Sequence, residues 1–141
     1  MSTRNLDQWA AQAAQNIVDD QDAKQIFKAI NTALGVLQSQ GVYACMLYLY
    51  AEDNAATRSI RTHLWSLLER LEQHLNIQWQ DEENRSVQRP HVHPARRNSK
   101  KDVLGFYATA IAPHLDTLLL VRDLYEQTLT YARYHAKALG A

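Results

Sequence analysis

The chain has 141 residues, an ordinary size for one domain and long enough to bury a hydrophobic core. Hydrophobic residues make up 46% of it and charged residues 21%, which excludes an intrinsically disordered protein. Its 15 basic and 15 acidic side chains give a formal net charge of zero, so no overall field attracts nucleic acid, and only a local cluster of cations would bind a polyanion.

The single cysteine, Cys45, excludes a framework of internal disulfides and fits a reducing compartment. The opening MSTRNLDQW lacks the apolar core of a signal peptide. The longest uncharged apolar run, GVYACMLYLYA, is far shorter than the roughly 20 residues that span a bilayer. We therefore expect a cytoplasmic protein with no membrane partner.

Helical periodicity predicts two helices in the first 40 residues. Apolar side chains recur at helical spacing over residues 5–19, and the acidic residues between 19 and 22 mark a break. A second apolar stripe follows and ends before Gly41, which is typical of a left-handed helix cap. The two stripes consist of Leu6, Trp9, Ala10, Ala13 and Ile17, and of Ile26, Ile30, Ala33, Leu34 and Leu37.

Residues 42–51 predict a short helix that is apolar on all sides. Such a helix usually lies in the middle of a bundle, so we expect this segment to be the most buried part of the chain. A charge introduced at Leu47 should then destabilise the protein severely, because an unpaired buried charge is very costly.

The clearest stripe belongs to a helix that we expect to begin at Thr57, as N-cap, and to run to about residue 79. Residues Ser99 to Asp102 resemble a capping box and predict a fifth helix that stops before Pro113. The stripe residues of the first of these helices are Ile60, Leu64, Leu67, Leu68, Leu71 and Leu75.

The last predicted helix covers about 116–138 and has two apolar sides. One stripe contains Leu118, Val121, Tyr125, Leu129, Ala132, Ala136 and Leu139. Leu120, Leu124 and Tyr131 lie nearly opposite, so this helix is either central in the bundle or half covered by another protein. The prediction is an all-α fold, a compact bundle of five to six helices forming a single domain over residues 1–141.

No motif in the chain is typical of a metal, cofactor or catalytic site. His91 and His93 lie in a proline-flanked loop without the paired ligands that zinc requires, even with His63 and His74 added. Cys45 falls in the apolar helix, where a thiol is generally inert. The acidic run at residues 81–83 is typical of a solvated helix end. We expect no metal, no cofactor and no catalytic residue, although an enzyme with dispersed residues would also leave no motif.

Basic residues, in contrast, gather locally. Residues 85–101 hold six Lys or Arg side chains and no acid, and the prolines at their centre predict a mobile loop over residues 89–101. Such cations suit phosphates, and the alternative is that they are ordinary surface charges. The candidate RNA-binding residues are Arg58, Arg61, Arg96, Arg97, Lys100, Lys101, Arg122, Arg133 and Lys137.

Three stretches resemble the small subunit of the type III-B (Cmr) CRISPR effector complex. NLDQWAAQAAQNIV is similar to the first helix of that family, KQIFKAINTALGVLQSQGVYACMLYLYAE to its next segment, and LLVRDLYEQTLTYARYHAKAL to its closing helix. They cover roughly half the chain, in order and at both ends, but not the loop at 89–101. The chain departs from the pattern at Trp9, where the family often has Arg, at Gln40 before the glycine, and at Tyr131, where Trp is common.

The resemblance implies a small α-helical, non-catalytic RNA-contacting structural subunit that acts in antiviral defence. Its implied partners are guide RNA and target RNA, the CRISPR backbone subunits and neighbouring small subunits. The related small subunit of type III-A complexes is also helical and stays open as an interpretation. A helical protein–protein adaptor with no direct RNA role is the alternative from another functional class.

Overall fold

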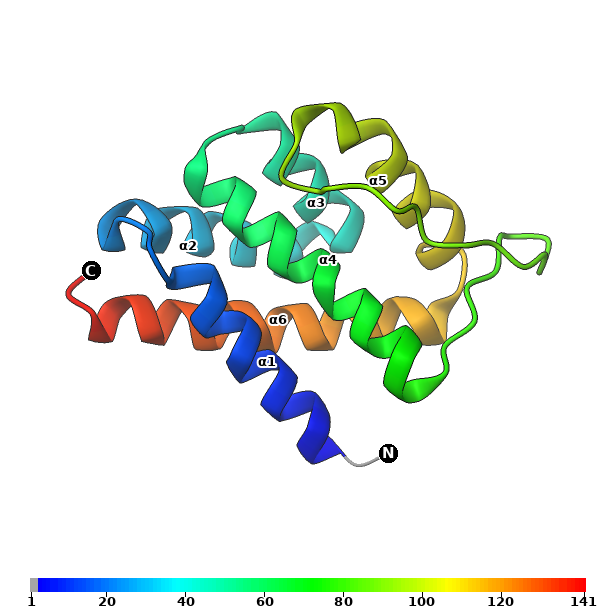
Figure 1. Cartoon of the computed structure of the whole chain (residues 1–141), viewed down its shortest axis with the longest axis horizontal. Coiled ribbons are helices and arrows are strands. Elements are labelled where there is room, and N and C mark those ends of the chain that lie inside the picture. The colour runs from blue at the N-terminus through cyan, green and yellow to red at the C-terminus, as the bar shows by residue number, and fades with distance from the viewer. Residues whose placement is uncertain (1–2) are drawn as a thin grey trace.

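Six α-helices make up most of the computed structural model, which describes the backbone of residues 3–141 and the side chains of residues 5–141 (Figure 1). A single 3₁₀ turn, Arg97–Ser99, precedes α5, and a π-helical stretch, Tyr107–Ile111, follows it. The predicted all-α bundle of five to six helices is confirmed. The helices are α1 (Thr3–Val18), α2 (Ala23–Gln40), α3 (Val42–Ala51), α4 (Ala55–Leu75), α5 (Lys100–Phe106) and α6 (Leu115–Ala138).

The longest helix, α6, makes the most extensive helix–helix contacts of the bundle, with α1 and α2. α1 and α2 pack along it, α4 packs against α1 and α3, and α5 lies against α3 (Figure 1). The predicted stripe from Val121 to Ala136 is buried, whereas Leu139 at its end is exposed. On the opposite side Leu124 is buried, and the Tyr131 hydroxyl donates to the Asp7 carboxylate of α1. Leu120 and Tyr131 are partly buried against the core, so the second apolar side of α6 is covered in part within the same chain.

The start of α4 differs from the prediction. Asn54, not Thr57, is the N-cap, and the two residues form a reciprocal capping box. The Thr57 amide donates to Asn54 Oδ1 and the Asn54 amide donates to Thr57 Oγ1, both at 3.0 Å. Thr57 thus takes the place that Glu or Gln usually has in this motif. The helix also ends earlier than expected, because Asn76 adopts a left-handed conformation (φ 56°) after Leu75.

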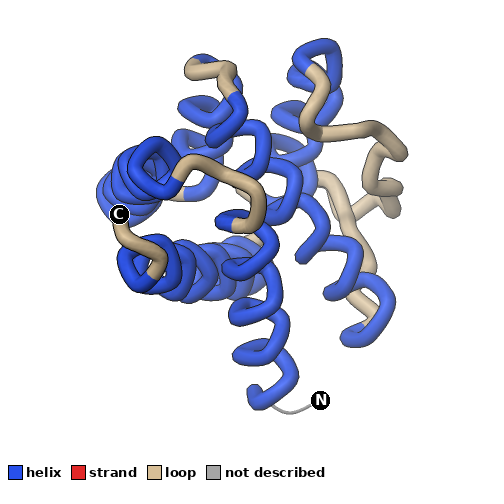
Figure 2. Tube along the Cα trace, turned by 60° about the vertical axis from the view of Figure 1, so that its left-hand side comes forward, coloured by secondary structure: helices blue, strands red, loops and turns tan. Residues whose placement is uncertain are grey.

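Beyond α4 the chain forms a tight turn rather than a solvated helix end. An isolated antiparallel bridge joins Gln80 to Ser86, and the Asp81 carboxylate accepts from the amides of Glu83 and Arg85, each at 2.9 Å. The hydrogen bond from the Arg85 amide is the main reason that the pKa of Asp81 lies below its usual range. This bridge is the only β pairing within residues 3–141, and the connection that carries it runs outside the bundle (Figure 2).

The predicted capping box at Ser99 is also wrong. Ser99 has a helical backbone conformation (φ −80°, ψ −8°), and its side chain makes no cap hydrogen bond to α5. Its hydroxyl is buried and is used in the preceding segment instead. The helix nevertheless continues through the π-helical stretch to Ile111 and stops before Pro113, as expected.

Only one side of α3 is buried, which corrects the prediction for residues 42–51. Cys45, Met46 and Leu49 are fully buried, but Tyr43 is 41% exposed and Leu47 is 42% exposed. An all-round apolar sequence does not reveal which face is covered, and in the structure α3 packs mainly against α2, α4 and α5. Because Leu47 is partly in water, a charge at this position would not be buried, and the prediction of severe destabilisation is wrong. No helix within residues 3–141 is long and apolar enough to cross a membrane.

We predict that Leu49→Ala lowers the free energy of unfolding by about 2–5 kcal/mol, because it leaves a cavity in the core. The matched variant Leu47→Ala should cost about 0.5 kcal/mol or less, since Leu47 is largely in water. Urea denaturation followed by circular dichroism measures both values. Equal losses in the two variants would contradict the one-sided burial of α3.

Candidate nucleic-acid interface

Four of the nine predicted RNA-binding residues come together on one exposed turn. Arg96 and Arg97 belong to the 3₁₀ region, and Lys100 and Lys101 open α5. All four side chains are exposed, and none forms an ion pair with a described carboxylate within 4 Å. We call these four residues the basic turn.

The backbone that leads into the basic turn is held by the guanidinium group of Arg61. This side chain is fully buried, although it is charged. Arg61 Nε donates to the Pro94 carbonyl oxygen at 2.7 Å, and Nη2 donates to the Ala95 carbonyl oxygen at 2.6 Å. Nη1 donates to the Leu49 carbonyl oxygen at 2.8 Å. The group therefore connects α4, α3 and the segment before α5.

A carboxylate and an aromatic ring complete the surroundings of Arg61. Asp53 Oδ1 lies 3.1 Å from Nη2, and the Tyr50 ring centroid lies 4.2 Å from the guanidinium carbon. Asp53 also accepts from Arg58 Nε at 2.9 Å. The hydrogen bond from Arg58, followed by that from Arg61, lowers the pKa of Asp53 to about 2. Asp53 is thus ionised at neutral pH and balances the buried charge.

Tyr50 and Ser99 fix the other side of the same segment. The Tyr50 hydroxyl donates to the Pro94 carbonyl oxygen at 3.1 Å and lies 2.8 Å from Ser99 Oγ. Ser99 Oγ in turn donates to the Arg96 carbonyl oxygen at 2.6 Å. Burial is the main cause that raises the pKa of Tyr50, so the phenol stays neutral and keeps its proton for donation. The backbone between Pro94 and Ser99 is consequently held at three of its carbonyl groups.

Arg89 is a second anchor, further back in the connection. It is buried, and its Nε donates to Glu72 Oε1 at 2.7 Å. The Trp79 indole N–H donates to the same oxygen at 2.5 Å, and the Arg89 guanidinium carbon lies 5.2 Å from the Trp65 ring centroid. The prolines do exclude a regular helix here, but buried side chains of α3 and α4 give the chain a fixed path. The expected mobile loop at 89–101 is corrected to an anchored segment.

The remaining predicted residues do not join the basic turn as a group. Arg61 has no exposed surface and uses its donors within the protein, so it cannot reach a phosphate in this fold, and its predicted role is corrected. Arg58 is half exposed and paired with Asp53. Arg122, Arg133 and Lys137 lie along α6, which crosses the lower half of the molecule in Figure 1, whereas α5 begins at the top.

A hollow of about 480 Å³ adjoins this region and contains two of the histidines considered for zinc. Arg58, His63, His93 and Ala95 line it, together with acidic residues of the turn between α1 and α2. Burial lowers the pKa of His63, opposed by the Asp19 charge. Among the described residues, no group of three or more His, Cys, Asp or Glu side chains is placed to hold a metal ion.

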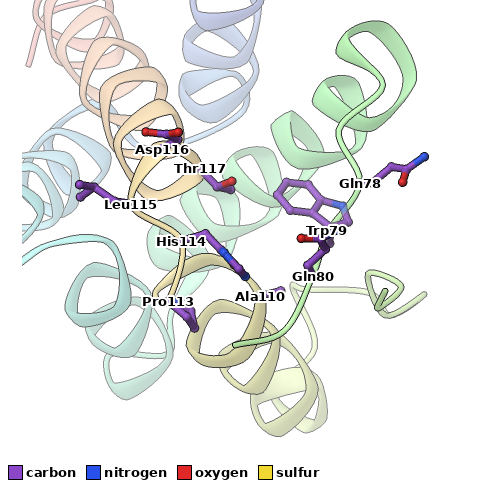
Figure 3. Close-up of a pocket in the computed structure, with 9 residues that line it drawn as sticks. All are labelled: Gln78, Trp79, Gln80, Ala110, Pro113, His114, Leu115, Asp116 and Thr117. Atoms are coloured by element: carbon purple, nitrogen blue, oxygen red, sulfur yellow. The ribbon is translucent and has the colours of Figure 1, made fainter. Parts of the chain in front are cut away.

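A second hollow, of about 340 Å³, lies between the start of α6 and residues 78–80 (Figure 3). Trp79 and His114 line it, but His114 Nε2 is already 2.8 Å from the Asp81 carbonyl oxygen. Asp116 is the only Asp, Glu, Lys or Arg side chain in its lining, so the hollow carries negative charge and is unsuited to phosphate.

Three further buried titratable groups, those of Cys45, Tyr107 and Tyr125, belong to the hydrophobic core. Burial raises the pKa of Cys45 to about 12, and its thiol faces the Ala33 carbonyl oxygen at 3.5 Å. The Tyr107 and Tyr125 hydroxyls lie 2.5 Å apart, and burial raises the pKa of both phenols. These three groups therefore stay protonated at neutral pH, and the predicted burial of Cys45 is confirmed.

Sequence reasoning missed the structural role of Arg61, although a signal was present. At about 100° per residue, Arg61 lies between Leu64 and Trp65 around the helix axis and is followed seven residues later by Leu68. It therefore falls inside the apolar sector of α4, where a charged residue is buried only with partners. The partners themselves come from residues 8 to 34 positions away, which no local pattern indicates.

Comparison of the chain with protein-family models, with curated proteins and with solved structures gives no match. A function must therefore be inferred from the geometry and charge of the described residues and from the resemblance of the three sequence stretches.

We predict that Arg61→Met lowers the free energy of unfolding by about 3–5 kcal/mol, the usual cost of removing one partner from a buried charge network. The change removes a donor from three backbone carbonyl groups, of which the Pro94 carbonyl keeps the Tyr50 hydroxyl. Thermal or urea unfolding measures the loss. The control is Arg58→Met, which should cost much less because the Arg58 side chain is half exposed to water. An Arg61→Met protein as stable as wild type would show that the network does not hold the segment.

Proposed function

We propose that this protein is a non-catalytic, RNA-contacting structural subunit of a type III CRISPR ribonucleoprotein effector. In this role it lies beside the backbone subunits and helps to hold guide RNA and target RNA. The observation that carries the proposal is the basic turn: four exposed cations without an acid partner, on a backbone that a buried arginine holds in place. The resemblance of the three stretches gives the assembly in which such a turn would act.

The chemistry of the basic turn suits a phosphate backbone. Arg96 and Arg97 present planar guanidinium groups that bind phosphate oxygens in pairs, and Lys100 and Lys101 add point charges. Phosphate contacts position a protein on nucleic acid without reading its sequence. This is what a subunit requires if base pairing between guide and target supplies all the sequence specificity.

Anchoring the segment favours binding further. A loop that becomes ordered only on binding loses conformational entropy at that moment, whereas the carbonyl groups of Pro94, Ala95 and Arg96 are already bonded in the free protein. Four cations on a chain of zero net charge still give only weak binding. Tight RNA binding would then come from several subunits acting together along one duplex.

Exposed apolar residues favour protein neighbours as well. Tyr43 and Leu119 border a hollow of about 190 Å³ whose rim includes Arg122, and both are more than 40% exposed. In the assembly this surface would meet other subunits. The same surface is the specific observation in favour of the second candidate function, a helical protein–protein adaptor with no direct RNA role.

We predict that replacing Arg96, Arg97, Lys100 and Lys101 with Ala weakens RNA binding to the same degree for unrelated sequences. The slope of log affinity against log salt should flatten by about 0.7 for each phosphate of a single strand that the variant no longer binds. Fluorescence anisotropy over a salt series measures both quantities.

A control variant replaces three other exposed cations, Lys28, Arg70 and Arg85, with Ala. It should change affinity and slope much less, because these residues are not part of the basic turn. If the two variants weaken binding equally for each charge removed, general electrostatics and not the basic turn is responsible. If the basic-turn variant binds like wild type, the RNA role proposed for this turn is wrong.

Purification of the tagged protein from cells that contain a type III system tests the assembly. We expect guide RNA and the backbone subunits to co-purify. The adaptor function instead predicts that protein partners co-purify and stay bound after nuclease treatment, with no RNA protected. Recovery of neither RNA nor backbone subunits would contradict the CRISPR assignment.

A further inference from the structure

A second group of cations, at the far end of α6, is combined with aromatic rings. Tyr134 is 63% exposed, and the Arg133 guanidinium carbon lies 5.3 Å from its ring centroid. Lys137 Nζ lies 5.8 Å from the ring centroid of Phe27 on α2. We call Phe27, Arg133, Tyr134 and Lys137 the α6 cluster. It joins the end of α6 to the beginning of α2, which pack against each other.

The charge around this cluster is positive. The sequence contains no Asp or Glu from residue 127 to residue 141, and neither Arg133 nor Lys137 has a described carboxylate within 4 Å. The nearest acid along α2 is Asp22, whose carboxylate accepts from the Gln25 amide as the helix cap. An anion is therefore favoured on the α6 side of the cluster, away from that cap.

Favourable interaction with the dipole of α6 explains part of this arrangement but not all of it. Cations in the last turns of a helix are stabilised by the carbonyl end, which accounts for Lys137 and in part for Arg133. It does not account for a large aromatic ring left in water beside them. Tyr134 is among the most exposed large hydrophobic side chains of the described residues, and it is not one of the residues that form or cover the core.

We propose that the α6 cluster is a subsite for single-stranded RNA, in which an unpaired base stacks on Tyr134 and the adjacent phosphates meet Arg133 and Lys137. The inference rests on the proposed function, because it assumes that the protein contacts RNA. Aromatic rings set among cations are the usual means of binding single strands, since every base has a face that stacks. The bases of a duplex are already stacked and paired, so the cluster would not accept them.

The two surfaces would then do different things. The basic turn offers charge alone and accepts the phosphates of either a duplex or a single strand. The α6 cluster adds a stacking face and selects unpaired RNA. They lie on different edges of the molecule in Figure 1, at the start of α5 and at the end of α6, so the loss of one leaves the other intact. A subunit of this kind would hold a duplex on one side and an unpaired segment on the other.

The test uses the full chain and three probes of about 12 nucleotides, within the range bound by single-strand sites. They are an oligoadenylate single strand, an RNA duplex and an abasic ribose-phosphate strand. We expect Tyr134→Ala to weaken binding of oligoadenylate by about 5- to 150-fold, the range that loss of one base–aromatic stack gives. Binding of the duplex and of the abasic strand should not change. The conservative variant Tyr134→Phe keeps the stacking face and should bind oligoadenylate as wild type does.

Salt dependence separates the ring from the charges. Tyr134→Ala should leave the slope of log affinity against log salt unchanged, whereas Lys137→Gln should reduce it by about 0.7. Tyr134 and Lys137 are both exposed, so these variants should fold, and circular dichroism checks that they do.

Failure of this inference is distinct from failure of the proposed function. If the basic-turn variant loses RNA affinity but Tyr134→Ala binds oligoadenylate as wild type does, the α6 cluster is not a stacking site and the proposed function stands. If Tyr134→Ala weakens all three probes equally, the ring does not stack on a base and the subsite is overturned. If the wild-type protein binds none of the probes, both proposals are overturned.

Discussion

The buried guanidinium group of Arg61 is the interaction on which the arrangement of α3, α4 and the segment before α5 depends. Removing a charge from water is costly, and burial is tolerated only where partners replace the lost hydration. Here three carbonyl oxygens, the Asp53 carboxylate and the Tyr50 ring surround the group. Because those carbonyl groups belong to α3 and to residues 94 and 95, the fold of the helices and the path of the connection are set by the same side chain.

This dependence links stability to the candidate interface. The carbonyl groups that Arg61 and Ser99 bond belong to residues 94 to 96, immediately before and within the basic turn. Arg61 is thus a positioning residue. It touches no RNA in the proposed function, but it holds the backbone immediately before Arg96 and Arg97. Asp53 has a similar role, because its carboxylate balances the buried charge of Arg61 and also pairs with Arg58 at the surface.

The positions of the helices could be predicted from the sequence, but the contacts that join the helices to one another and to the connection could not. Apolar periodicity placed the buried stripe of α6 and the end of α2 at Gly41, because those features are local. It failed for α3, whose all-round apolar sequence does not reveal that Leu47 faces water. It failed again for Arg61, whose partners are distant in sequence, and for the connection, where prolines predicted mobility and buried side chains imposed a fixed path. Local patterns indicate which face is apolar, and long-range contacts decide what covers it.

The distribution of acids explains how a chain of zero net charge can present free cations. Several carboxylates are used to pair the arginines that hold the structure: Asp53 pairs Arg58 and Arg61, and Glu72 pairs Arg89. The basic turn and the last turns of α6 are left without such partners among the described residues. Neutrality over the whole chain thus limits long-range attraction, whereas any short-range attraction of an anion would come from these two unpaired groups. A protein with this distribution would bind a polyanion only where its own surface meets it closely, which is the situation of a subunit inside an assembly that already contains the RNA.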